Sequence, residues 1–534
     1  MEHVISGRHL VGGEERGEPD PAFHGVDPRD RSALPGAFAE ASAQDVATAT
    51  ALAARAAQDL RAWPTDRIAT LLRTMADHLL ASGEQIVRVA DAESGLGTAR
   101  LQGELGRTVG QFRMFAEIVE SGEHLGIIID HADPDIVPPR PDLRRMLVPL
   151  GPVAVFGASN FPLAFSVPGG DTASALAAGC PVVIKAHPSH PATSEVTARC
   201  LIAAADEVDA PAGTVALLQG RGHEVGRQLV LDPNVTAVAF TGSRQGGRAI
   251  MDLAASRDVP IPVHAEMSSL NPVVVTPAAL ARRAEQIAAG FVASLTLGTG
   301  QFCTKPGLLL LPVGAAGDAL VDDVAAQLDA APAGLMLNGG IRSLLLDRLG
   351  SSSSVPGVRV RVDGRPELTD GEQGGLSCRP SLLEVDAKTY LRRTELREEH
   401  FGPVSVVVRH EAGELPAIIG ALEGQLTATL HAEPEEVEDL VPLRDLLSAK
   451  VGRVLWNGFP TGVSVTRSQH HGGPYPATSD ARSTSVGGTA LERFLRPVVF
   501  QDVPESLLPP VLRSDALVHT PRIVDGRRLH AGEA

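Results

Sequence analysis

Apolar side chains recur at three- and four-residue intervals through the first part of the chain, a spacing that places them on one face of a helix. The stretches Asp45–Leu60 and Thr65–Ser82 show this pattern most clearly. A polar, proline-rich stretch over residues 131–142 follows, and the pattern of Leu143–Leu150 then predicts a strand or hairpin. We therefore expect the first 130 residues to be mainly helical.

From Gly151 the pattern changes to short apolar runs separated by helical segments. The runs begin about 20 to 35 residues apart, which is typical of βαβ units and therefore of a parallel sheet. Such sheets bind nucleotides at the carboxyl ends of their strands. The expected strands are residues 152–156, 181–185, 214–218, 235–240 and 261–265.

A second α/β rhythm begins near residue 271 and predicts another sheet with a long helix over Pro277–Leu297. The serine- and glycine-rich stretch Gly350–Gly375 predicts surface loops, and Glu492–Gln501 predicts a strand outside both rhythms. The fold class is thus α/β. The strands expected in the second rhythm are residues 271–275, 307–312, 404–409, 426–430 and 451–456.

Composition adds limits on size and partners. At 534 residues the chain is too long for one core, and two or three structural units are expected. Its formal net charge of −17 argues against nucleic acid or an anionic membrane surface as a partner. No apolar run approaches the roughly 18 residues that a membrane-spanning helix needs.

The N-terminal residues and the cysteines indicate the compartment. Residues 1–30 are polar and acidic, without the basic-then-apolar pattern of a signal peptide. The four cysteines lie far apart and form no C-x-x-C pair, which disfavours a disulfide framework and a zinc site. We expect a cytoplasmic protein that binds no metal. The cysteines are Cys180, Cys200, Cys303 and Cys378.

Cys303 has the setting of a reactive residue. It lies in the glycine-rich segment Gly298–Thr304, between a predicted helix and a predicted strand. Glycine gives such a loop the freedom to face a thiol toward a ligand and to point a backbone N–H at a developing oxyanion. A loop cysteine taken alone is nevertheless more often inert than catalytic.

Two polar residues stand at the ends of predicted strands, where active-site groups of parallel sheets gather. Glu266 follows 261–265, and a carboxylate there could have its pKa raised towards neutrality and act as a general base. Asn160 follows the strand that breaks at Gly157, and its amide could donate to an oxyanion. The alternatives are a surface carboxylate and a turn-forming asparagine.

The segment Phe240–Gly247 runs from a strand into a helix through small residues. Free N–H groups at a helix N-terminus suit a pyrophosphate. The glycine spacing is not G-x-G-x-x-G, so this segment alone is a weak signal.

These motifs stand in the order of the aldehyde dehydrogenase family, which the chain resembles from Phe38 to Gln501. Asn160-Phe161-Pro162 resembles the family's oxyanion motif, Glu266 its general base, and Gly300-Gln301-Phe302-Cys303 its nucleophile loop. The resemblance implies that Cys303, Glu266 and Asn160 are catalytic and that Phe161 and Phe302 contact the substrate.

The resemblance also implies NAD or NADP as cofactor. Ile184-Lys185 resembles the strand that ends in a cofactor-binding lysine, and Phe240–Ser243 resembles the pyrophosphate turn. Glu399–Pro403 resembles the segment whose glutamate holds the nicotinamide ribose and whose phenylalanine contacts the ring. The implied contacts are Ser159, Lys185, Gly242, Ser243, Glu399 and Phe401.

NADP is slightly favoured over NAD. Pro188 stands where members that prefer NAD usually carry a ribose-binding glutamate. Without that carboxylate a 2′-phosphate would meet no repulsion, and Lys185, Arg221 or His223 could attract it.

By the same resemblance we expect an aldehyde dehydrogenase-like fold with three parts. A Rossmann-like cofactor domain would comprise residues 1–130 and 151–266, and an α/β catalytic domain residues 267–470. Residues 131–150 and 471–534 would form a small bridging sheet that joins subunits into a homodimer or homotetramer, since an unpaired strand is a liability in a monomer.

Three segments narrow the resemblance: 159–166, 240–244 and 471–480 are similar to α-ketoglutaric semialdehyde (2,5-dioxopentanoate) dehydrogenases. Their product would be 2-oxoglutarate. A substrate with a distal α-keto acid needs a cation, and Arg113 is the leading candidate, on a helix that the family uses to line the substrate tunnel. A solvated arginine on a helix surface is the alternative.

The implied reaction is NAD(P)-dependent oxidation of an aldehyde to an acid through a Cys303 thioester. Other aliphatic or fatty aldehydes remain open as substrates, as do a cofactor-independent cysteine hydrolase and a non-catalytic scaffold. We expect His470 and His471 to lie in a polar loop, because adjacent residues rarely converge on one metal ion.

Overall fold

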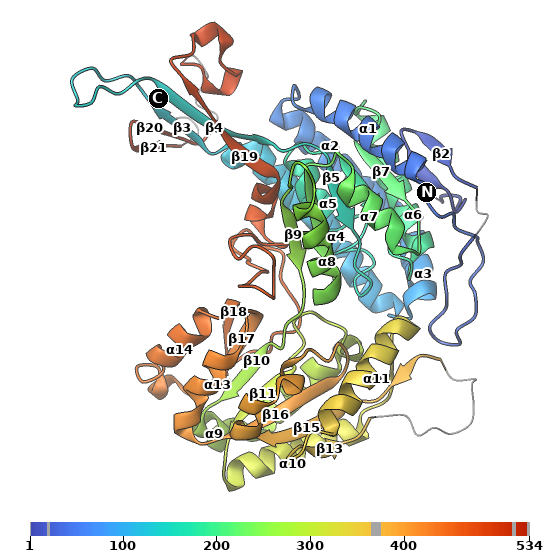
Figure 1. Cartoon of the computed structure of the whole chain (residues 1–534), viewed down its shortest axis with the longest axis vertical. Coiled ribbons are helices and arrows are strands. Elements are labelled where there is room, and N and C mark those ends of the chain that lie inside the picture. The colour runs from blue at the N-terminus through green and yellow to red at the C-terminus, as the bar shows by residue number, and fades with distance from the viewer. Residues whose placement is uncertain (1, 19–21, 365–374, 515–519, 531–534) are drawn as a thin grey trace.

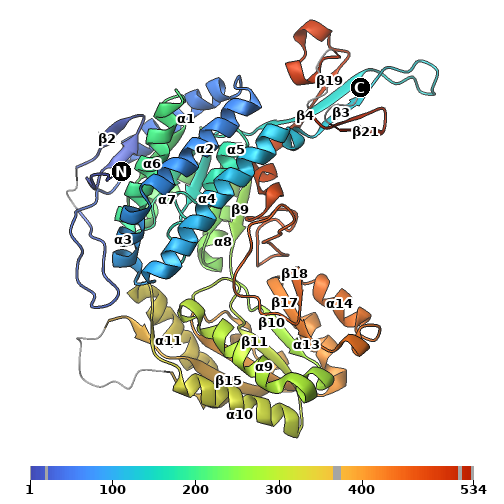
Figure 2. The ribbon, with the colours of Figure 1, turned by 180° about the vertical axis from the view of Figure 1, so that it is seen from behind.

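The computed structural model describes residues 2–18, 22–364, 375–514 and 520–530. These residues form two α/β lobes and a projecting arm, with the N-terminal half of the chain in the upper lobe of Figure 1. The view from behind shows the same separation of the two lobes (Figure 2). None of the described helices is long and apolar enough to cross a membrane.

The upper lobe contains a seven-stranded sheet of order β2-β1-β7-β6-β5-β8-β9. Strands β7, β6, β5, β8 and β9 are neighbours in this order and pair in parallel. Strands β1 and β2 add an antiparallel edge beside β7. All five strands predicted for this region are confirmed. The bounds are β1 His9–Val11, β2 Glu14–Arg16, β5 Val153–Phe156, β6 Val182–Lys185, β7 Val215–Leu218, β8 Ala237–Thr241 and β9 Val263–Glu266.

The register of this sheet aligns the carboxyl ends of β5, β6 and β8 with one another. Phe156 of β5 pairs with Lys185 of β6 on one side and with Phe240 of β8 on the other. Chain order runs outward from β5 in both directions, so the strand order reverses between β5 and β8. Ligands of open parallel sheets bind at such a reversal.

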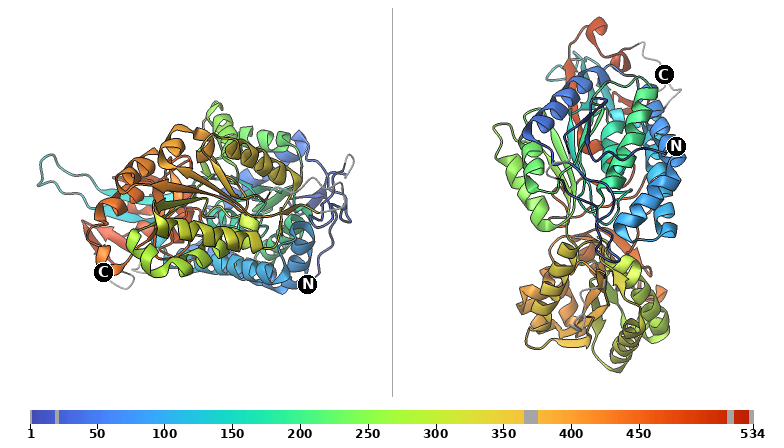
Figure 3. Two further views of the ribbon diagram at one scale, coloured as in Figure 1. Left: turned by 90° about the horizontal axis from the view of Figure 1, so that it is seen from below. Right: turned by 90° about the vertical axis from the view of Figure 1, so that its right-hand side faces the viewer.

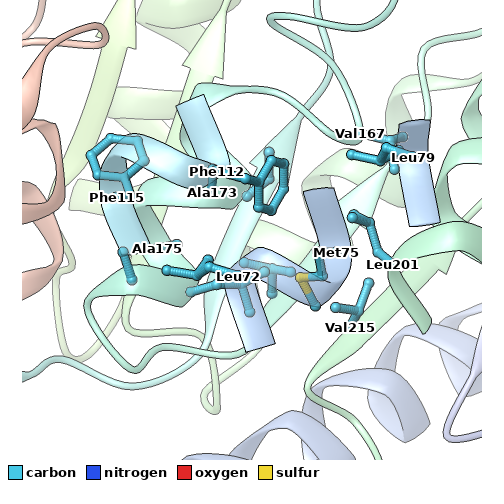
Figure 4. Packing of buried hydrophobic residues seen from close by; sticks show 14 of the residues in the cluster. Leu72, Met75, Leu79, Phe112, Phe115, Val167, Ala173, Ala175, Leu201 and Val215 are labelled. Carbon is cyan, nitrogen blue, oxygen red and sulfur yellow. The ribbon is translucent and has the colours of Figure 1, made fainter. Parts of the chain in front are cut away.

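Helices cover the upper sheet. The predicted helical character of the first 130 residues is confirmed from Ala43 to Ser121, whereas the described residues before Ala43 form strands β1 and β2, turns and irregular segments. The first helix begins at a capping box in which Ser42 and Asp45 satisfy each other's backbone N–H groups. Met75, Phe112 and Leu201 pack from different helices into the largest core (Figure 4). The bounds are α1 Ala43–Leu60, α2 Thr65–Ala81, α3 Gly83–Ser94, α4 Thr98–Ser121, α5 Gly170–Ala177, α6 Pro191–Glu207, α7 His223–Leu231 and α8 Arg244–Ala255.

The lower lobe contains a second seven-stranded sheet, of order β13-β15-β16-β11-β10-β17-β18. It includes the five strands predicted for this region, and the long predicted helix is α9. The strands are β10 Pro272–Val275, β11 Leu308–Pro312, β13 Arg359–Val362, β15 Ser381–Asp386, β16 Val404–His410, β17 Gln425–His431 and β18 Val451–Trp456, beside a separate pair, β12 Gly334–Leu335 and β14 Ser377–Cys378. The helices are α9 Pro277–Thr296, α10 Ala315–Ala330, α11 Gly339–Ser353, α12 Ala387–Arg392, α13 Leu415–Ala421 and α14 Val441–Ser448.

The prediction of surface loops over Gly350–Gly375 is wrong for part of that stretch. Helix α11 continues to Ser353 because Leu345 and Leu349 anchor it in the core of the lower lobe. Residues 359–362 form β13, which pairs with β15. Residues 365–374 lie outside the described residues.

The arm is a five-stranded sheet of order β19-β4-β3-β20-β21 that projects from the upper lobe (Figure 3). Strand β4 pairs along its whole length with β19, although the two are far apart in the sequence. This confirms both predicted strands, while β3 is a correction to the helical expectation for residues up to 130. The bounds are β3 Ile127–Asp130, β4 Leu143–Pro149, β19 Leu495–Gln501, β20 Arg522–Val524 and β21 Arg527–Leu529.

Short 3-10 turns connect several of these elements. One of them, η2, carries the glycines of the predicted nucleophile loop. The turns are η1 Glu123–Leu125, η2 Leu297–Gly300, η3 Thr394–Arg397, η4 Ala412–Glu414, η5 Pro434–Glu436, η6 Gly488–Phe494, η7 Glu505–Leu507 and η8 Pro510–Leu512.

Candidate active site

Cys303 follows a turn whose backbone requires glycine. Gly298, Thr299 and Gly300 have φ values of 56°, 58° and 63°. A Cβ atom at Gly300 would lie 2.4 Å from the backbone carbon of Gly402, so a side chain cannot be accommodated there. Asn271 holds the other side of the loop, since its Nδ2 donates to the carbonyl of Cys303 at 2.8 Å. The loop is therefore fixed from two directions.

Three reactive side chains meet beside this loop. The Sγ of Cys303 lies 3.3 Å from Nε2 of His471, and the same nitrogen lies 2.9 Å from Oε1 of Glu266. One sulfur, nitrogen or oxygen atom from each side chain lies within 4.8 Å of the other two. Ser485 completes the cluster by donating to Oε2 of Glu266 at 2.6 Å. The structure thus brings the predicted nucleophile and base together and adds a histidine between them.

His471 lies in a loop, as predicted, but its side chain is only 1% exposed and enters the site. The segment after β18 folds back along β9, where Met267 N–H donates to the Ala477 carbonyl at 2.8 Å and Glu266 bridges Thr478. The boundary drawn between residues 470 and 471 therefore falls inside the site. The resemblance of residues 471–480 to one group of dehydrogenases was the signal in the sequence that could have identified His471 as a site residue.

The pKa of Glu266 moves opposite to the expected direction. Burial alone would raise this pKa, but the charge and hydrogen bond of His471 and the hydrogen bond of Ser485 outweigh burial and hold it below its ordinary value. Burial and the adjacent Glu266 carboxylate raise the pKa of the Cys303 thiol well above its ordinary value. The free site therefore favours a carboxylate beside a protonated thiol.

Asn160 lies beside the nucleophile loop, as predicted. Its Nδ2 donates to the Gln301 carbonyl at 3.0 Å, which uses one of its two hydrogens. The backbone carbonyl of Asn160 accepts a hydrogen bond from Nη2 of Arg100 at 2.8 Å. The neighbouring Phe161 and Phe302 are buried and meet edge to face, with ring centroids 5.0 Å apart. These two rings give the site an apolar wall.

The residues expected to bind a cofactor gather at the carboxyl edge of the upper sheet. Lys185 ends β6, Ser159 follows β5, and Gly242 and Ser243 follow β8. A Cβ atom at Gly242 would lie 2.7 Å from the Phe240 ring, so this turn keeps its backbone bare. Ser243 caps α8 by accepting from Gly246 N–H at 3.1 Å.

The Glu40 carboxylate lies at this edge of the sheet, close enough to Lys185 for their charges to interact. Burial lowers the pKa of Lys185 to about 8, and the Glu40 carboxylate acts in the opposite direction. Both carboxylate oxygens of Glu40 accept from the Arg221 backbone N–H at 2.9 Å. The side chains of Arg221 and His223 are exposed nearby. The premise that Pro188 leaves the edge without a negative charge is therefore wrong.

Glu399 lies close enough to Cys303 for its charge to raise the thiol pKa, and Phe401 follows two residues later in the segment before β16. Lys305, two residues after the nucleophile, donates to the carbonyls of His400 and Val404, both at 2.8 Å. This amine ties the segment to the nucleophile loop. Burial raises the pKa of Glu399, and Lys305 acts against that rise.

Arg113 does not reach the site, which corrects its assignment as a substrate contact. Its side chain is 50% exposed and forms an ion pair with Asp77 at 2.9 Å. The position lies on the outer face of α4, which the helical spacing could not distinguish from the inner face of an otherwise amphipathic helix.

A model of the aldehyde dehydrogenase family matches residues 17–473. The chain belongs to this family. Two relatives are similar over nearly the whole of both chains. α-Ketoglutaric semialdehyde dehydrogenase 2 of Azospirillum brasilense is 48% identical, with 98% of this aldehyde dehydrogenase and 99% of the relative covered. α-Ketoglutaric semialdehyde dehydrogenase of Acinetobacter baylyi is 41% identical, with 98% of each covered.

Solved structures support the fold of this aldehyde dehydrogenase. Betaine aldehyde dehydrogenase of Staphylococcus aureus gives a TM-score of 0.79 at 20% identity, covering 93% of this chain and 95% of that one. 3,6-Anhydro-L-galactose dehydrogenase gives 0.78 at 22% identity, covering 92% and 99%. The predicted aldehyde dehydrogenase-like fold is thus confirmed. The protein is an enzyme, an NAD(P)-dependent aldehyde dehydrogenase.

Proposed function

We propose that this enzyme oxidises α-ketoglutaric semialdehyde (2,5-dioxopentanoate) to 2-oxoglutarate through a thioester on Cys303. The substrate is supported by similarity over nearly the full chain to two enzymes named for it. The mechanism is supported by one observation above all, the contact of Cys303 Sγ with His471 Nε2, which in turn contacts Glu266.

His471 activates the nucleophile. When His471 is neutral and carries its ring proton on Nδ1, the thiol proton of Cys303 moves to Nε2, and the resulting N–H donates to the Glu266 carboxylate. The low pKa of Glu266 keeps that carboxylate ionised and so stabilises the imidazolium. The thiolate then attacks the aldehyde carbon and forms an S–C bond while the carbonyl oxygen becomes an oxyanion.

Asn160 and the backbone N–H of Cys303 stabilise this oxyanion. One hydrogen of the Asn160 amide is fixed on the Gln301 carbonyl, which aims the second hydrogen away from the loop backbone. Donors held in this way need no reorganisation during the reaction, and losing one costs about 3 kcal/mol, or roughly a hundredfold in rate.

Glu266 serves the second half of the reaction. A nicotinamide held beside Cys303 would supply the hydride acceptor for the former aldehyde carbon, which would leave a thioester on Cys303. Glu266 takes a proton from a water molecule, and the hydroxide adds to the thioester carbon. The S–C bond then breaks, releasing the carboxylic acid and restoring the Cys303 sulfur.

The carboxyl edge of the upper sheet fits a dinucleotide. Bare backbone at Gly242 and the capped N-terminus of α8 suit a pyrophosphate, and Lys185 with Ser159 suits a ribose. Glu399 and Phe401 would hold the nicotinamide ribose and ring. Arg221 and His223 remain candidates for a 2′-phosphate.

For the cofactor preference, two features oppose each other. Pro188 in place of a ribose-binding glutamate favours NADP, whereas the Glu40 carboxylate would repel a 2′-phosphate near Lys185. We infer that both cofactors are accepted, with the balance set by Glu40.

The arm is proposed to join subunits into a homodimer or homotetramer. Strand β19 is an edge of the arm, and β18 is an edge of the lower sheet. Both edges carry exposed apolar side chains, with Val499 52% and Trp456 46% exposed. Pairing β19 of one copy with β18 of another would cover both edges.

The function is tested with a panel of aldehydes that differ in length and charge, each with NAD and with NADP. The expected result is reduced nicotinamide formed fastest from 2,5-dioxopentanoate. Cys303→Ala should abolish this signal while cofactor binding, followed by quenching of protein fluorescence, remains. Turnover retained in Cys303→Ala, or ester hydrolysis without any nicotinamide signal in the wild type, would overturn the proposal.

A further inference from the structure

Helix α4 turns a second arginine, Arg107, toward the aromatic wall of the site. Its guanidinium carbon lies 5.0 Å from the ring centroid of Phe165 and 5.8 Å from that of Phe161. Nε and Nη2 of Arg107 are buried and have no hydrogen-bond partner among the described residues. A buried guanidinium with free donors is unfavourable unless an anion joins it.

The carboxylate of Glu104, on the same helix, uses one oxygen to hold backbone, while its Oε2 has no hydrogen-bond partner among the described residues. Oε1 of Glu104 accepts from the backbone N–H groups of Leu163 and Ala164, at 2.9 and 3.0 Å. Burial raises the pKa of Glu104, which favours its uncharged form. No ion pair joins Glu104 to Arg107 in the described part of the chain. Glu104 therefore fixes the oxyanion-motif backbone and acts on Arg107 only through its charge, without a hydrogen bond to the guanidinium.

The other arginines around the site have structural partners. Arg100 donates to the Asn160 carbonyl at 2.8 Å, and Arg453 donates to the Pro460 carbonyl at 2.7 Å. Arg107 donates no hydrogen bond within the described ranges, yet it is close to the reacting groups. Its charge acts on Cys303, where it opposes the rise of the thiol pKa that burial and Glu266 cause.

We propose that Arg107 binds the distal carboxylate of the aldehyde substrate, with the substrate's carbon chain lying along Phe161 and Phe165. This rests on the proposed function, which gives the substrate a carboxylate remote from its aldehyde. The planar fork of arginine matches a carboxylate with two parallel hydrogen bonds. Arg107 thus takes the role that the sequence had suggested for Arg113, six residues further along α4.

The test compares two aldehydes of equal length, 2,5-dioxopentanoate and pentanal, in the full-length enzyme. In Arg107→Gln the ratio of kcat/KM for the first over the second should fall about a hundredfold, because a desolvated carboxylate loses its charge partner. Arg113→Gln, on the same helix but exposed, is the matched control and should keep the wild-type ratio. If Arg107→Gln does not fold, Arg107→Met, whose flexible side chain can pack on Phe165, gives the same comparison.

A second measurement needs no turnover. Glutarate, a dicarboxylate without an aldehyde, should slow alkylation of Cys303 by iodoacetamide in the wild type and in Arg113→Gln, but not in Arg107→Gln. A ratio that stays at the wild-type value in Arg107→Gln, whether both activities are kept or both fall equally, would overturn the role of Arg107, as would glutarate protection of Cys303 that persists in this variant. A wild type without preference for 2,5-dioxopentanoate over pentanal would instead overturn the proposed substrate.

Discussion

At the scale of single residues, the charge on Glu266 has opposite effects on two steps. The ionised carboxylate stabilises a protonated His471 and can take a proton from water. The same charge raises the pKa of Cys303 and so disfavours the thiolate. Because the Cys303 pKa is raised, the thiolate fraction and the rate of alkylation increase as pH rises.

Glu266→Gln should therefore separate the two effects. Aldehyde oxidation should fall about a thousandfold, since water loses its base. Alkylation of Cys303 by iodoacetamide should become faster at pH 8, because removing the negative charge lowers the thiol pKa and moves the alkylation profile to lower pH. Rates are measured by mass spectrometry of the Cys303 peptide across a pH series.

Cys303→Ala supplies the background for that series. The other three cysteines are buried and should react slowly in every variant. Slower alkylation of Cys303 in Glu266→Gln than in the wild type would contradict the electrostatic coupling.

Glu40 is the residue whose charge should decide cofactor choice. Glu40→Gln removes the negative charge but keeps an acceptor for the Arg221 N–H. The ratio of kcat/KM with NADP to that with NAD should rise about tenfold, the effect of one like charge removed near a phosphate. Glu14→Gln, at an exposed carboxylate on β2, should leave the ratio unchanged. An unchanged ratio in Glu40→Gln would place the 2′ position elsewhere.

At the scale of elements, turn η2 and the segment before β16 hold each other in place. Gly300→Ala would push a methyl group into the backbone of Gly402 and Pro403. The nucleophile loop should shift, and kcat should fall about a hundredfold, since small displacements of a reacting group cost that much. Steady-state kinetics and thermal melting are measured together.

Gly13→Ala is the matched control for this change. Gly13 also has a positive φ, of 83°, but open space surrounds its Cβ position. Its variant should lose a little stability and no activity. Equal loss of activity in the two variants would indicate general backbone strain in place of a displaced nucleophile.

Strands whose residues are all apolar are readily predicted from the sequence. Strand β5 is wholly apolar and wholly buried, so its run is visible in the sequence. Strand β15 escaped prediction because it contains Glu384, whose burial depends on an ion pair with Arg361 at 2.9 Å. Strands β1 and β2 have only three residues each, too few to show a period.

At the scale of the whole molecule, the arm should carry the contact between subunits. Val499→Lys places a charge on the exposed edge of β19 and should shift the enzyme toward a smaller species. Light scattering coupled to gel filtration measures this shift. Val259→Lys, at a 72% exposed valine between α8 and β9, should keep the wild-type size. A monomeric wild type would contradict the proposed role of the arm.

A site residue can be predicted from the sequence when the residues that identify it are its near neighbours in the chain. Cys303, Glu266 and Asn160 are recognised from short motifs. Each lies within a few residues of the loop or strand end that identifies it. His471 reaches Glu266 across 205 positions, only after the segment beyond β18 has folded back on β9. Arg107 differs from Arg113 only in helix face, which the packing of α4 decides.

The bond between Asn160 and the Gln301 carbonyl joins groups from different lobes, as does the contact of Cys303 with the cluster around Glu266. A chain in which one lobe has folded and the other has not possesses a sulfur but neither its proton acceptor nor its oxyanion donor. Such a partly folded chain consequently lacks the geometry that catalyses aldehyde oxidation, and turnover begins only when both lobes have come together.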